Sequence, residues 1–513
     1  MKRIWSAALC VLLVLSLFSG CSESPEAYIP TGDALDDGPV SNRPSSTPNQ
    51  SQNFSMVYYP GLSMNPYTCA DPTNRTLLPL MYQGLFNVDR DYNTIPLLCD
   101  RYSVSSDMKT YTFYLAQARF SDGTALTAND VVTSLAAAKA SSYYSGRFLH
   151  IISITGNGDS VTMQLDTPFE NLPLLLDIPI VKAAEVNNPL PTGTGAYVME
   201  DSVSGKRLRR QSAWWCVREA DLVVTAAYIP LVEAESPSQV RDQFELADVG
   251  LVCADPGSDH YADYRCDYEI WDCENGLFLY LVSSSKSAVF SNDTVRKALT
   301  HAIDRDYLVE EYYRGFARSA TLPASPLSPY YNATLASKYK YNAQKFVDAL
   351  NEAQLQGSSI TLLLNSDDSL RLRAGQQIAN MLRECGLNVT VLEMTTDKFT
   401  EHVKWGTYDL YLAQTKLSPN MDLTPFFRSG GSLSYGGLAD TSTYIMAQQA
   451  LANKGNYYNL HEMVMEDGQL CPILVRSYAV YATRGLVTQL SPSRDNLFCH
   501  SVGKTMADAK ITQ

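Results

Sequence analysis

The stretch that decides the fold is ITLLLNSDDSLRLRAGQQIANMLRECGLNVTVLE, residues 360–393. Its apolar start, 360–364, is typical of a buried strand. A helix is expected over 370–385, because apolar side chains recur there three and four residues apart, and Gly386 is a typical stop signal. A second strand follows at 387–393. Strand, helix and strand in this order imply two parallel strands with helical cover, so the sequence predicts an α/β fold.

Other elements follow from the same kinds of pattern. Strands are expected at residues 54–59, 111–115, 160–165 and 276–282, and a helix at 131–140. Thr127 and Asp130 have the spacing of a capping box at the start of that helix. A second helix is expected to be capped by Asp293, because the apolar positions within 295–303 form one core-facing stripe.

The N-terminus, residues 1–21, has the pattern of an export signal with a lipid attachment site. After a basic start, the apolar run 7–18 is shorter than the roughly 20 residues that span a bilayer. Ser19-Gly20-Cys21 then resembles a bacterial lipobox, in which the cysteine carries the lipid. The alternative is plain secretion. Either way, we expect the protein to work outside the cytoplasm.

Composition limits the remaining possibilities. A chain of 513 residues, 45% hydrophobic and 18% charged, has enough material for more than one globular domain. The net charge of −14 argues against nucleic acid as a partner, because that requires clustered Lys and Arg. Residues 22–53 are rich in Ser, Pro, Asp and Asn and are expected to form a disordered tether, which could reach about 30 Å.

Eleven cysteines are present. Loss of Cys10 with the signal and acylation of Cys21 would leave an odd number without the spacing of a disulfide scaffold. Free, mostly buried thiols are therefore expected, with one local bridge among Cys253, Cys266 and Cys273 left open. No CxxC pair is present, and no cofactor or metal is expected.

Seven segments carry motifs in a fixed order. They are FSDGTALTANDVV (120–132), DTPF (166–169), PTGTGAY (191–197), QSAWW (211–215), FELAD (244–248), VRKALTHAIDR (295–305) and YD (408–409). Together they resemble the family 5 extracellular solute-binding proteins, which are the oligopeptide, dipeptide and nickel receptors of ABC importers. The resemblance extends from about Phe54 to the C-terminus.

The resemblance implies a two-lobed, periplasmic-binding-protein-like (type II) α/β fold with an extra subdomain in the first lobe. The first lobe would comprise 54–265, completed by 477–513, and the second lobe 266–476. Two crossing strands near 266–276 and 470–480 would form the hinge. Closure would bury a solute between the lobes, and the closed form would dock on a membrane permease. The chain would act as a monomer, held by its lipid at the outer face of the cytoplasmic membrane.

The resemblance also implies a ligand-binding segment after the YD motif. Peptide-binding members have an aspartate there for the peptide's free amino group, preceded by a tryptophan. Here the aspartate position holds Ser418 or Pro419. The tryptophan position holds Thr415 or Lys416, so the usual ammonium clamp is absent. Asp422 is nearby but matches a downstream helix-capping aspartate better. Lys416 favours a ligand with an acidic group, and its alternative role is a solvated loop residue.

Further lining residues are implied by the family's geometry. They are Tyr59, Gly61, Tyr144, Leu279, Leu281, Gln414 and Arg476. On their strand, Leu279 and Leu281 are expected to face the cleft, and Phe278 and Tyr280 the opposite side. For each lining residue, core packing or surface solvation is the alternative. Peptides are the leading ligand class, with nickel complexes, sugars and other organic solutes left open.

Three other functions compete with solute capture. Ser283 and Lys286 fit the S-x-x-K pattern of penicillin-recognising enzymes, but the K-T-G partner motif is absent. A nickel receptor is disfavoured because the six histidines lack metal-ligand spacing. A surface chaperone or signalling receptor that kept the fold but not the permease stays open.

Overall fold

The computed structural model describes residues 40–41, 54–216, 226–256, 264–487, 490–494 and 496–498, all within one compact unit, Gly38–Gln513. The export signal and Cys21 lie outside the described residues. Within the predicted tether, β1 (Val40–Ser41) pairs with β13 (Tyr268–Ser283). Such backbone pairing requires no apolar side chains, which is why composition does not reveal it. In the described ranges, no helix combines the length and apolarity needed to cross a membrane.

One mixed sheet joins the two halves of the chain. Its strand order is β16-β15-β17-β13-β18-β12-β2-β11-β10-β9, with β14 paired to β18. Its further bounds are β2 (Met56–Tyr58), β9 (Tyr197–Ser202), β10 (Gly205–Arg210), β11 (Tyr228–Glu233), β12 (Leu251–Ala254), β14 (Ala317–Ser319), β15 (Ser359–Asn365), β16 (Asn388–Met394), β17 (Leu410–Lys416) and β18 (Leu470–Thr483). Strands from the start and the end of the chain are neighbours in this order, so the sheet ties distant segments together.

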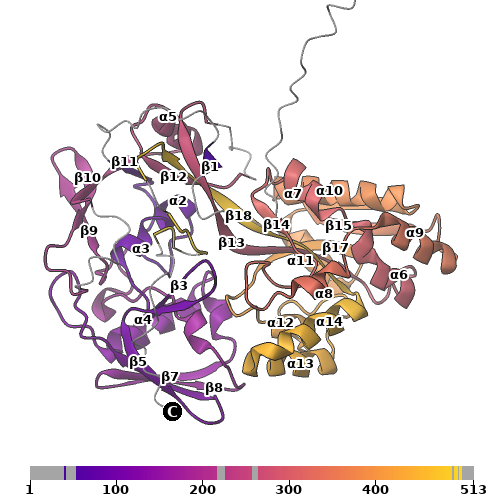
Figure 1. Ribbon diagram of the computed structural model, residues 1–513, viewed down its shortest axis with the longest axis horizontal. Coiled ribbons are helices and arrows are strands. Elements are labelled where there is room, and N and C mark those ends of the chain that lie inside the picture. The colour runs from indigo at the N-terminus through magenta and orange to yellow at the C-terminus, as the bar shows by residue number, and fades with distance from the viewer. Residues whose placement is uncertain are drawn as a thin grey trace, which may run out of the picture. The chain divides into compact units, whose positions relative to one another are not determined.

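Two long antiparallel strands, β13 and β18, form the centre of the sheet and lie side by side in Figure 1. Their pairing runs from Tyr268 opposite Thr483 to Val282 opposite Leu470, with a register shift after Glu274. A bulge of this kind bends a strand and increases its local twist. β13 and β18 therefore include the segments, near 266–276 and 470–480, that the resemblance assigns to a hinge.

The structure joins two predicted segments into one strand. The residue pattern predicts a strand at 276–282 and the resemblance a crossing strand near 266–276, whereas β13 runs without a break from Tyr268 to Ser283. Asn275-Gly276 has the composition of a turn, but the structure accommodates Gly276 within the strand at φ +70°. A positive φ carries little penalty for glycine, so the strand continues through the bulge.

The strand–helix–strand unit predicted over 360–393 is confirmed. β15 and β16 pair in parallel, and α10 (Ser369–Glu384) connects them. Gly386 has φ +103°, as expected for a residue just after the end of a helix. β15 is also parallel to β17, so the carboxyl ends of all three strands lie at one edge.

A separate antiparallel sheet forms the extra subdomain of the first half. Its order is β5-β6-β8-β7, with bounds β5 (Cys99–Val104), β6 (Thr110–Leu115), β7 (Ile151–Asn157) and β8 (Ser160–Leu165), and β3 (Phe86–Val88) pairs with β4 (Thr94–Pro96) nearby. α4 (Ala128–Ala140) packs on β7 and β8. The predicted capping box at its start is confirmed, because Thr127 and Asp130 each accept from the other's backbone N–H.

The remaining helices of the described residues are α2 (Pro72–Arg75), α3 (Leu78–Met81), α5 (Pro237–Glu245), α7 (Arg305–Glu311), α8 (Ala333–Ser337), α9 (Ala343–Glu352), α11 (Thr396–Trp405), α12 (Thr424–Phe427), α13 (Thr441–Ala452) and α14 (Tyr457–Asp467).

The helix predicted within 295–303 differs from the prediction in its start and its end. α6 (Asp293–Ala298) is capped by Asn292, not by Asp293, and continues as a 3₁₀ turn over Leu299–Ala302. Asn292 has an extended backbone and accepts from the Val295 N–H at 3.2 Å, while Asp293 is already helical.

Separate apolar cores lie along the length of β13 and β18. The core of the first half includes Trp271 from β13 and Val480 from β18. A core of the second half includes Leu279 and Leu474 from the same two strands. Each long strand thus contributes buried side chains to both halves, as a two-lobed fold with shared strands requires.

Among the described cysteines, Cys69, Cys99, Cys216, Cys253, Cys385 and Cys471 are free thiols. Cys253 on β12 and Cys273 on β13 lie on opposite sides of β18, so two strand spacings of about 4.8 Å each separate them. That separation exceeds the reach of a disulfide. A local bridge between these two cysteines is therefore not formed, and free thiols fit the expectation.

The capping box predicts a measurable stability effect. Thr127→Ala leaves the Asp130 N–H without its side-chain acceptor, and we expect it to lower the free energy of unfolding by about 1 kcal/mol. Urea unfolding followed by circular dichroism measures this change. Thr334→Ala, at an exposed position of α8, is the matched control and should be close to neutral. Equal stabilities of the two variants would contradict the role of the cap.

Candidate functional site

The topology of the sheet brings two sets of strand ends together. In the first half, β2 is parallel to β11 and β12, and Tyr59 and Asp255 directly follow β2 and β12. In the second half, β15 and β17 are parallel and end at Asn365 and Lys416. Both sets run toward the middle of β18, where Arg476 lies. Ligands of open α/β sheets bind outside the carboxyl ends of strands, so this junction is the candidate site.

Arg476 ties the two sets of ends together. One guanidinium nitrogen donates to both carboxylate oxygens of Asp255, at 3.0 and 2.7 Å, and the other donates to Gln414 Oε1 at 3.1 Å. Asp368, which follows β15, lies 3.8 Å away. Burial alone would lower the pKa of Arg476, but Asp255 and Asp368 raise it overall. The charge of Arg476 is therefore fixed, and both of its terminal nitrogens donate hydrogen bonds to the protein.

A second contact across the junction is built on the Tyr143 ring. Lys416 Nζ lies 2.6 Å from the Tyr143 hydroxyl and 3.8 Å from the ring centre. The guanidinium carbon of Arg75, from α2, is 3.3 Å from the same ring centre. Arg75 also donates to the Tyr144 hydroxyl at 2.9 Å. Cations favour aromatic faces, so the ring holds positive charge from both halves of the chain at one place.

The other expected lining residues of the first half take different positions. Tyr59 is half-buried, and its backbone N–H donates to Asn74 at 2.8 Å. Burial, followed by the charge of Asp71, raises the pKa of the Tyr59 hydroxyl. Gly61 is exposed. Tyr144 is buried in the first core; its hydroxyl accepts from Arg75, and its ring packs edge-on against the Tyr143 ring.

The expected strand residues of the second half pack differently from the expectation. Leu279 and Leu281 have no exposed surface and belong to the second core. Phe278 and Tyr280 are buried as well, in a core on the other face. Because both faces of this central strand are covered, core packing, the alternative role, describes Leu279 and Leu281 in this structure. Thr415 is half-buried at the end of β17.

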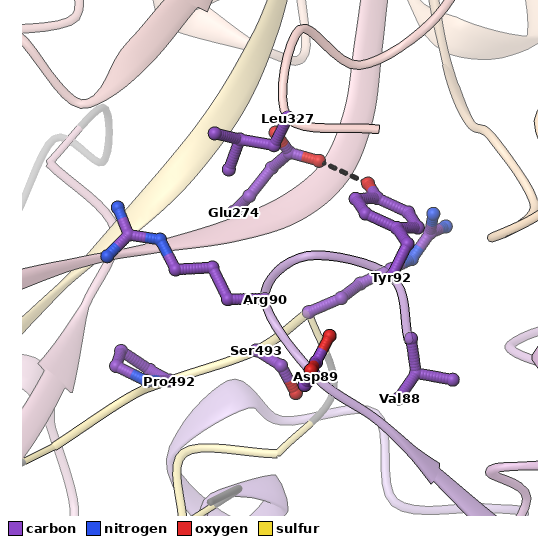
Figure 2. A pocket seen from close by; sticks show the side chains of 9 residues that line it. Val88, Asp89, Arg90, Tyr92, Glu274, Leu327, Pro492 and Ser493 are labelled. Carbon is purple, nitrogen blue, oxygen red and sulfur yellow. Dashed lines mark hydrogen bonds between the residues drawn. The ribbon is translucent and has the colours of Figure 1, made fainter. Parts of the chain in front are cut away.

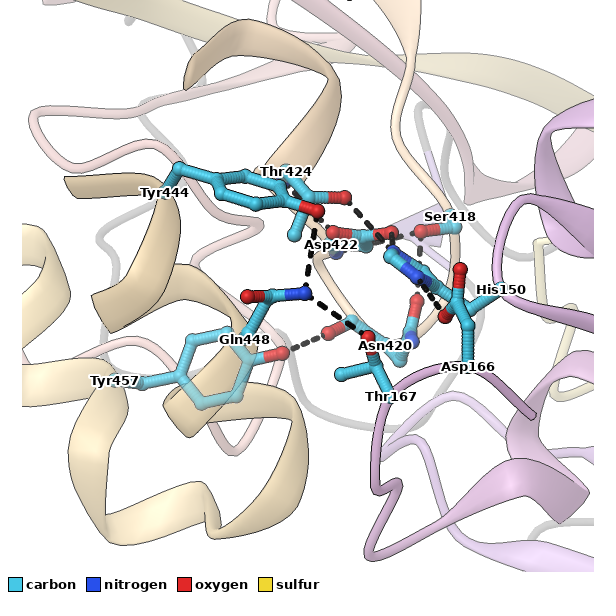
Figure 3. A network of polar contacts seen from close by, with 10 residues as sticks. All are labelled: His150, Asp166, Thr167, Ser418, Asn420, Asp422, Thr424, Tyr444, Gln448 and Tyr457. Atoms are coloured by element: carbon cyan, nitrogen blue, oxygen red, sulfur yellow. Dashed lines mark hydrogen bonds and ion pairs between the residues drawn. The ribbon is translucent and has the colours of Figure 1, made fainter. Parts of the chain in front are cut away.

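Asp422 belongs to a buried network around His150, shown in Figure 3. His150 Nδ1 is 2.8 Å from Asp166, and Nε2 is 2.9 Å from the Thr424 hydroxyl and 3.3 Å from Asp422. Asp422 also accepts from the Thr424 N–H at 2.8 Å, just before α12, although the N-cap position of that helix is Leu423 and has no side-chain cap. Burial lowers the pKa of His150, but Asp422 and Asp166 raise it overall.

A further hydrogen bond joins the two halves nearby: Gln448, on α13, donates to the Thr167 hydroxyl at 3.0 Å (Figure 3). Within the second half, the Tyr457 hydroxyl donates to the Asn420 carbonyl. Sequence reasoning did not single out His150 for this role, because its partner Thr424 is 274 residues away. The only local signal was its position 16 residues before Asp166.

A small pocket beside the bend of β13 is too small for an organic solute (Figure 2). It offers about 20 Å³, room for about one water molecule. Its walls include Tyr92, whose hydroxyl donates to Glu274 at 2.7 Å, and Ser325 donates to the other oxygen of Glu274 at 2.7 Å. Burial raises the pKa of Glu274. These contacts fix the bend and leave little space.

Two competing functions find little support in the described residues. Ser283 has no exposed surface, and its hydroxyl lies 3.4 Å from the Gln469 carbonyl, so an acylating substrate could not reach it. Lys286, its partner in the S-x-x-K pattern, is exposed. Within the described ranges, His, Cys, Asp and Glu side chains form no group of three that could hold a metal ion.

Comparisons with known proteins agree with this architecture. The family model "Bacterial extracellular solute-binding proteins, family 5 Middle" matches residues 93–434. The glutathione-binding protein GsiB of Pectobacterium atrosepticum is 27% identical over 361 residues, covering 65% of this chain and 67% of that protein.

Solved structures show the same fold. NikA of Brucella suis, in complex with Fe(III)-EDTA, superposes with a TM-score of 0.69 at 18% identity and covers 87% of this chain and 98% of its own. The oligopeptide-binding protein AppA of Bacillus subtilis, in complex with a nonapeptide, gives 0.59 at 19% identity over 86% of this chain and 96% of its own. The two-lobed type II fold is therefore confirmed.

The His150 network predicts a pH-dependent stability. Because the folded-state pKa of His150 is raised, its ion pairs stabilise the fold fully below the unfolded pKa of about 6.5 and are lost as pH rises through the folded pKa. We therefore expect His150→Gln to destabilise the protein more at pH 5.5 than at pH 8.5 in urea unfolding.

His301→Gln is the matched control for this experiment. Burial lowers the pKa of His301, so its contribution has the opposite sign and favours the fold more as pH rises. A stability difference between wild type and His150→Gln that stays constant or grows with pH would contradict the assignment.

Proposed function

Because this chain belongs to the bacterial extracellular solute-binding proteins of family 5, the substrate-binding components of ABC transporters, we propose that it captures short peptides between two lobes and delivers them to a membrane permease. The first lobe comprises 54–265 with 477–513, and the second comprises 266–476. The separate cores along β13 and β18 support this division.

The observation that carries the proposal is the meeting of strand ends at Arg476. Residues from the first lobe (Asp255) and the second lobe (Gln414) bind one guanidinium there. A solute bound at this place would contact both lobes. Because those contacts form only when the lobes are together, the solute would bind the closed form more tightly than the open form and shift the equilibrium toward it. The Lys416–Tyr143 contact is a second such bridge.

Charge at the junction favours a ligand with an acidic group. Lys416 stands near the position where peptide-binding members carry an aspartate for the amino group, and Arg75 lies against the same ring. A peptide would then be held by its backbone and its carboxylate, without the usual ammonium clamp. The relative named for glutathione fits this class, because glutathione is a tripeptide with two carboxylates.

The second candidate is an acidic non-peptide solute, and the same cations favour it. It would use the same two lobes and the same strand ends. The distinction between the two candidates is the length and backbone of the ligand, which the fold alone does not fix.

The position of the protein in the cell forms part of the proposal. Cys21 carries a lipid that holds the receptor at the outer face of the cytoplasmic membrane, and the chain acts there as a monomer beside its permease. The family's extracytoplasmic role and the lipobox at Ser19-Gly20-Cys21 support this arrangement.

Ligand class is tested by native mass spectrometry of the full chain, purified gently, stripped and exposed to glutathione and to a mixture of peptides. We expect retained masses that fit peptides of a few residues. Retention of an acidic non-peptide solute, with no peptide bound, would move the protein to the second candidate.

Lys416→Ala should weaken binding of a peptide with a free acidic group by about tenfold, because a charge-assisted hydrogen bond contributes about 1.5–3 kcal/mol. Isothermal titration calorimetry measures the dissociation constant. Lys404→Ala, at an exposed position of α11, is the control and should bind like wild type. An affinity of Lys416→Ala equal to that of the control would exclude Lys416 from the ligand site.

Cys21→Ala should move the protein from the membrane fraction to the soluble extracytoplasmic fraction and abolish labelling by a clickable fatty acid. The lipid is the proposed anchor, and its acceptor is the thiol of this residue. Fractionation with immunoblotting measures the change, and Cys10→Ala serves as the control. Membrane retention of Cys21→Ala would reject the lipid anchor.

A further inference from the structure

Arg371 is a mostly buried cation with an unpaired Nε–H donor. It lies in the first turn of α10, and its side chain is 14% exposed. Its Nε atom makes no hydrogen bond within the part of the chain that the structure describes. The nearest carboxylate oxygen, on Asp368, is 3.8 Å from Nε, which is beyond hydrogen-bond distance. A guanidinium offers five donors, so this one can receive an anionic group.

Tyr313 presents a second unused donor in the same neighbourhood. Its side chain is 2% exposed, and its hydroxyl finds no partner among the described residues. Leaving a buried polar group unpaired costs about 1–3 kcal/mol. Burial raises the pKa of this hydroxyl, and Arg371 and Asp368 are among the charges that act on it. The hydroxyl stays protonated and can donate to an anion.

Both residues adjoin the junction of strand ends. The guanidinium carbon of Arg476 is 5.7 Å from the centre of the Tyr313 ring, and Arg476 lies 3.8 Å from Asp368, the residue that caps α10. Asp255 and Gln414 already occupy Arg476. Arg371 therefore supplies this cluster with a guanidinium whose Nε–H has no partner among the described residues.

We propose that Arg371 and Tyr313 form the subsite that receives a carboxylate of the bound solute, with Arg371 forming the charged contact and Tyr313 a hydrogen bond. The proposal rests on the proposed function, since it names the chemical group that the cleft selects. The N-terminal end of α10, a helix of 16 residues, adds a favourable dipole for an anion.

Physical chemistry separates this role from a structural one. If Tyr313 only filled the core, Tyr313→Phe would leave affinity unchanged, and removing an unpaired buried hydroxyl would not destabilise the protein. A binding role predicts the opposite pattern: unchanged or higher stability without ligand, and weaker binding. The same reasoning applies to Arg371→Gln, because the Nε of Arg371 makes no hydrogen bond in the described residues and its one ion-pair contact, with Asp368, is as long as 3.8 Å.

The test compares matched ligands on the full chain by calorimetry and thermal shift. The panel contains glutathione and peptides of two to five residues as free acids and as C-terminal amides, and small organic acids with their esters. We expect wild type to bind acids at least tenfold more tightly than their neutral partners. Arg371→Gln should lose about 10- to 100-fold of affinity for the acids, and Tyr313→Phe about 5- to 10-fold. Arg373→Gln, on the exposed side of α10, is the control and should match wild type.

Each outcome decides the proposal. Acid-selective binding that disappears in Arg371→Gln supports the subsite, and if only non-peptide acids bind in this way, the subsite stands while the peptide assignment fails. Equal binding of acids and neutral partners, or equal effects of Arg371→Gln and Arg373→Gln, overturns the subsite and leaves solute capture intact. Binding of neutral solutes only overturns the subsite, and failure of the whole panel overturns both proposals.

Discussion

The antiparallel pairing of β13 with β18 is the constraint on which the rest of the structure depends. Each strand contributes side chains to the core of the first half and to the core of the second half. The same pairing places the carboxyl ends of two parallel strand sets against the middle of β18. One run of backbone hydrogen bonds therefore determines three features: the position of the candidate site, the division into lobes and the bend after Glu274.

Charges are distributed unevenly around this centre. Beside the bend, the carboxylates have partners within the protein. Glu274 accepts hydrogen bonds from two hydroxyls, and Asp272 forms ion pairs with Arg90 and Arg318. At the strand ends, by contrast, basic groups gather on Tyr143 and around Asp368. A protein with a net charge of −14 thus concentrates positive charge where its halves meet. Such an arrangement can draw an anion into a molecule whose overall field repels it.

Local features were predictable from sequence. The helix within 360–393 and the capping box at Thr127 depend on residues within one or two turns, and both are confirmed. The first residue of α6 was harder to predict from sequence. Asn292 and Asp293 are adjacent and are both favoured at the N-cap position, and only the backbone conformation decides between them. The residue pattern alone predicts a strand only from Gly276, because the pairing that extends β13 back to Tyr268 is with β18, about 200 residues later in the chain.

Features that depend on tertiary contacts were not predictable. Alternation along 278–281 cannot reveal which face meets a cleft when both faces are buried. His150 and Arg371 attracted no attention, because a lone histidine or a lone arginine in a first helical turn usually faces solvent. What distinguishes Arg371 is a buried Nε–H without a hydrogen-bond partner in the described residues, and that is visible only in the folded structure.

The late position of β18 in the chain has a consequence for how the protein is made. Neither core is complete until residues 470–483 have left the ribosome, because β12 and β13 both pair with β18, which these residues form. Contacts between segments this far apart form slowly. During most of its synthesis the chain therefore lacks its central strand and cannot complete its fold. An incompletely folded chain is the form that can pass through a translocation channel.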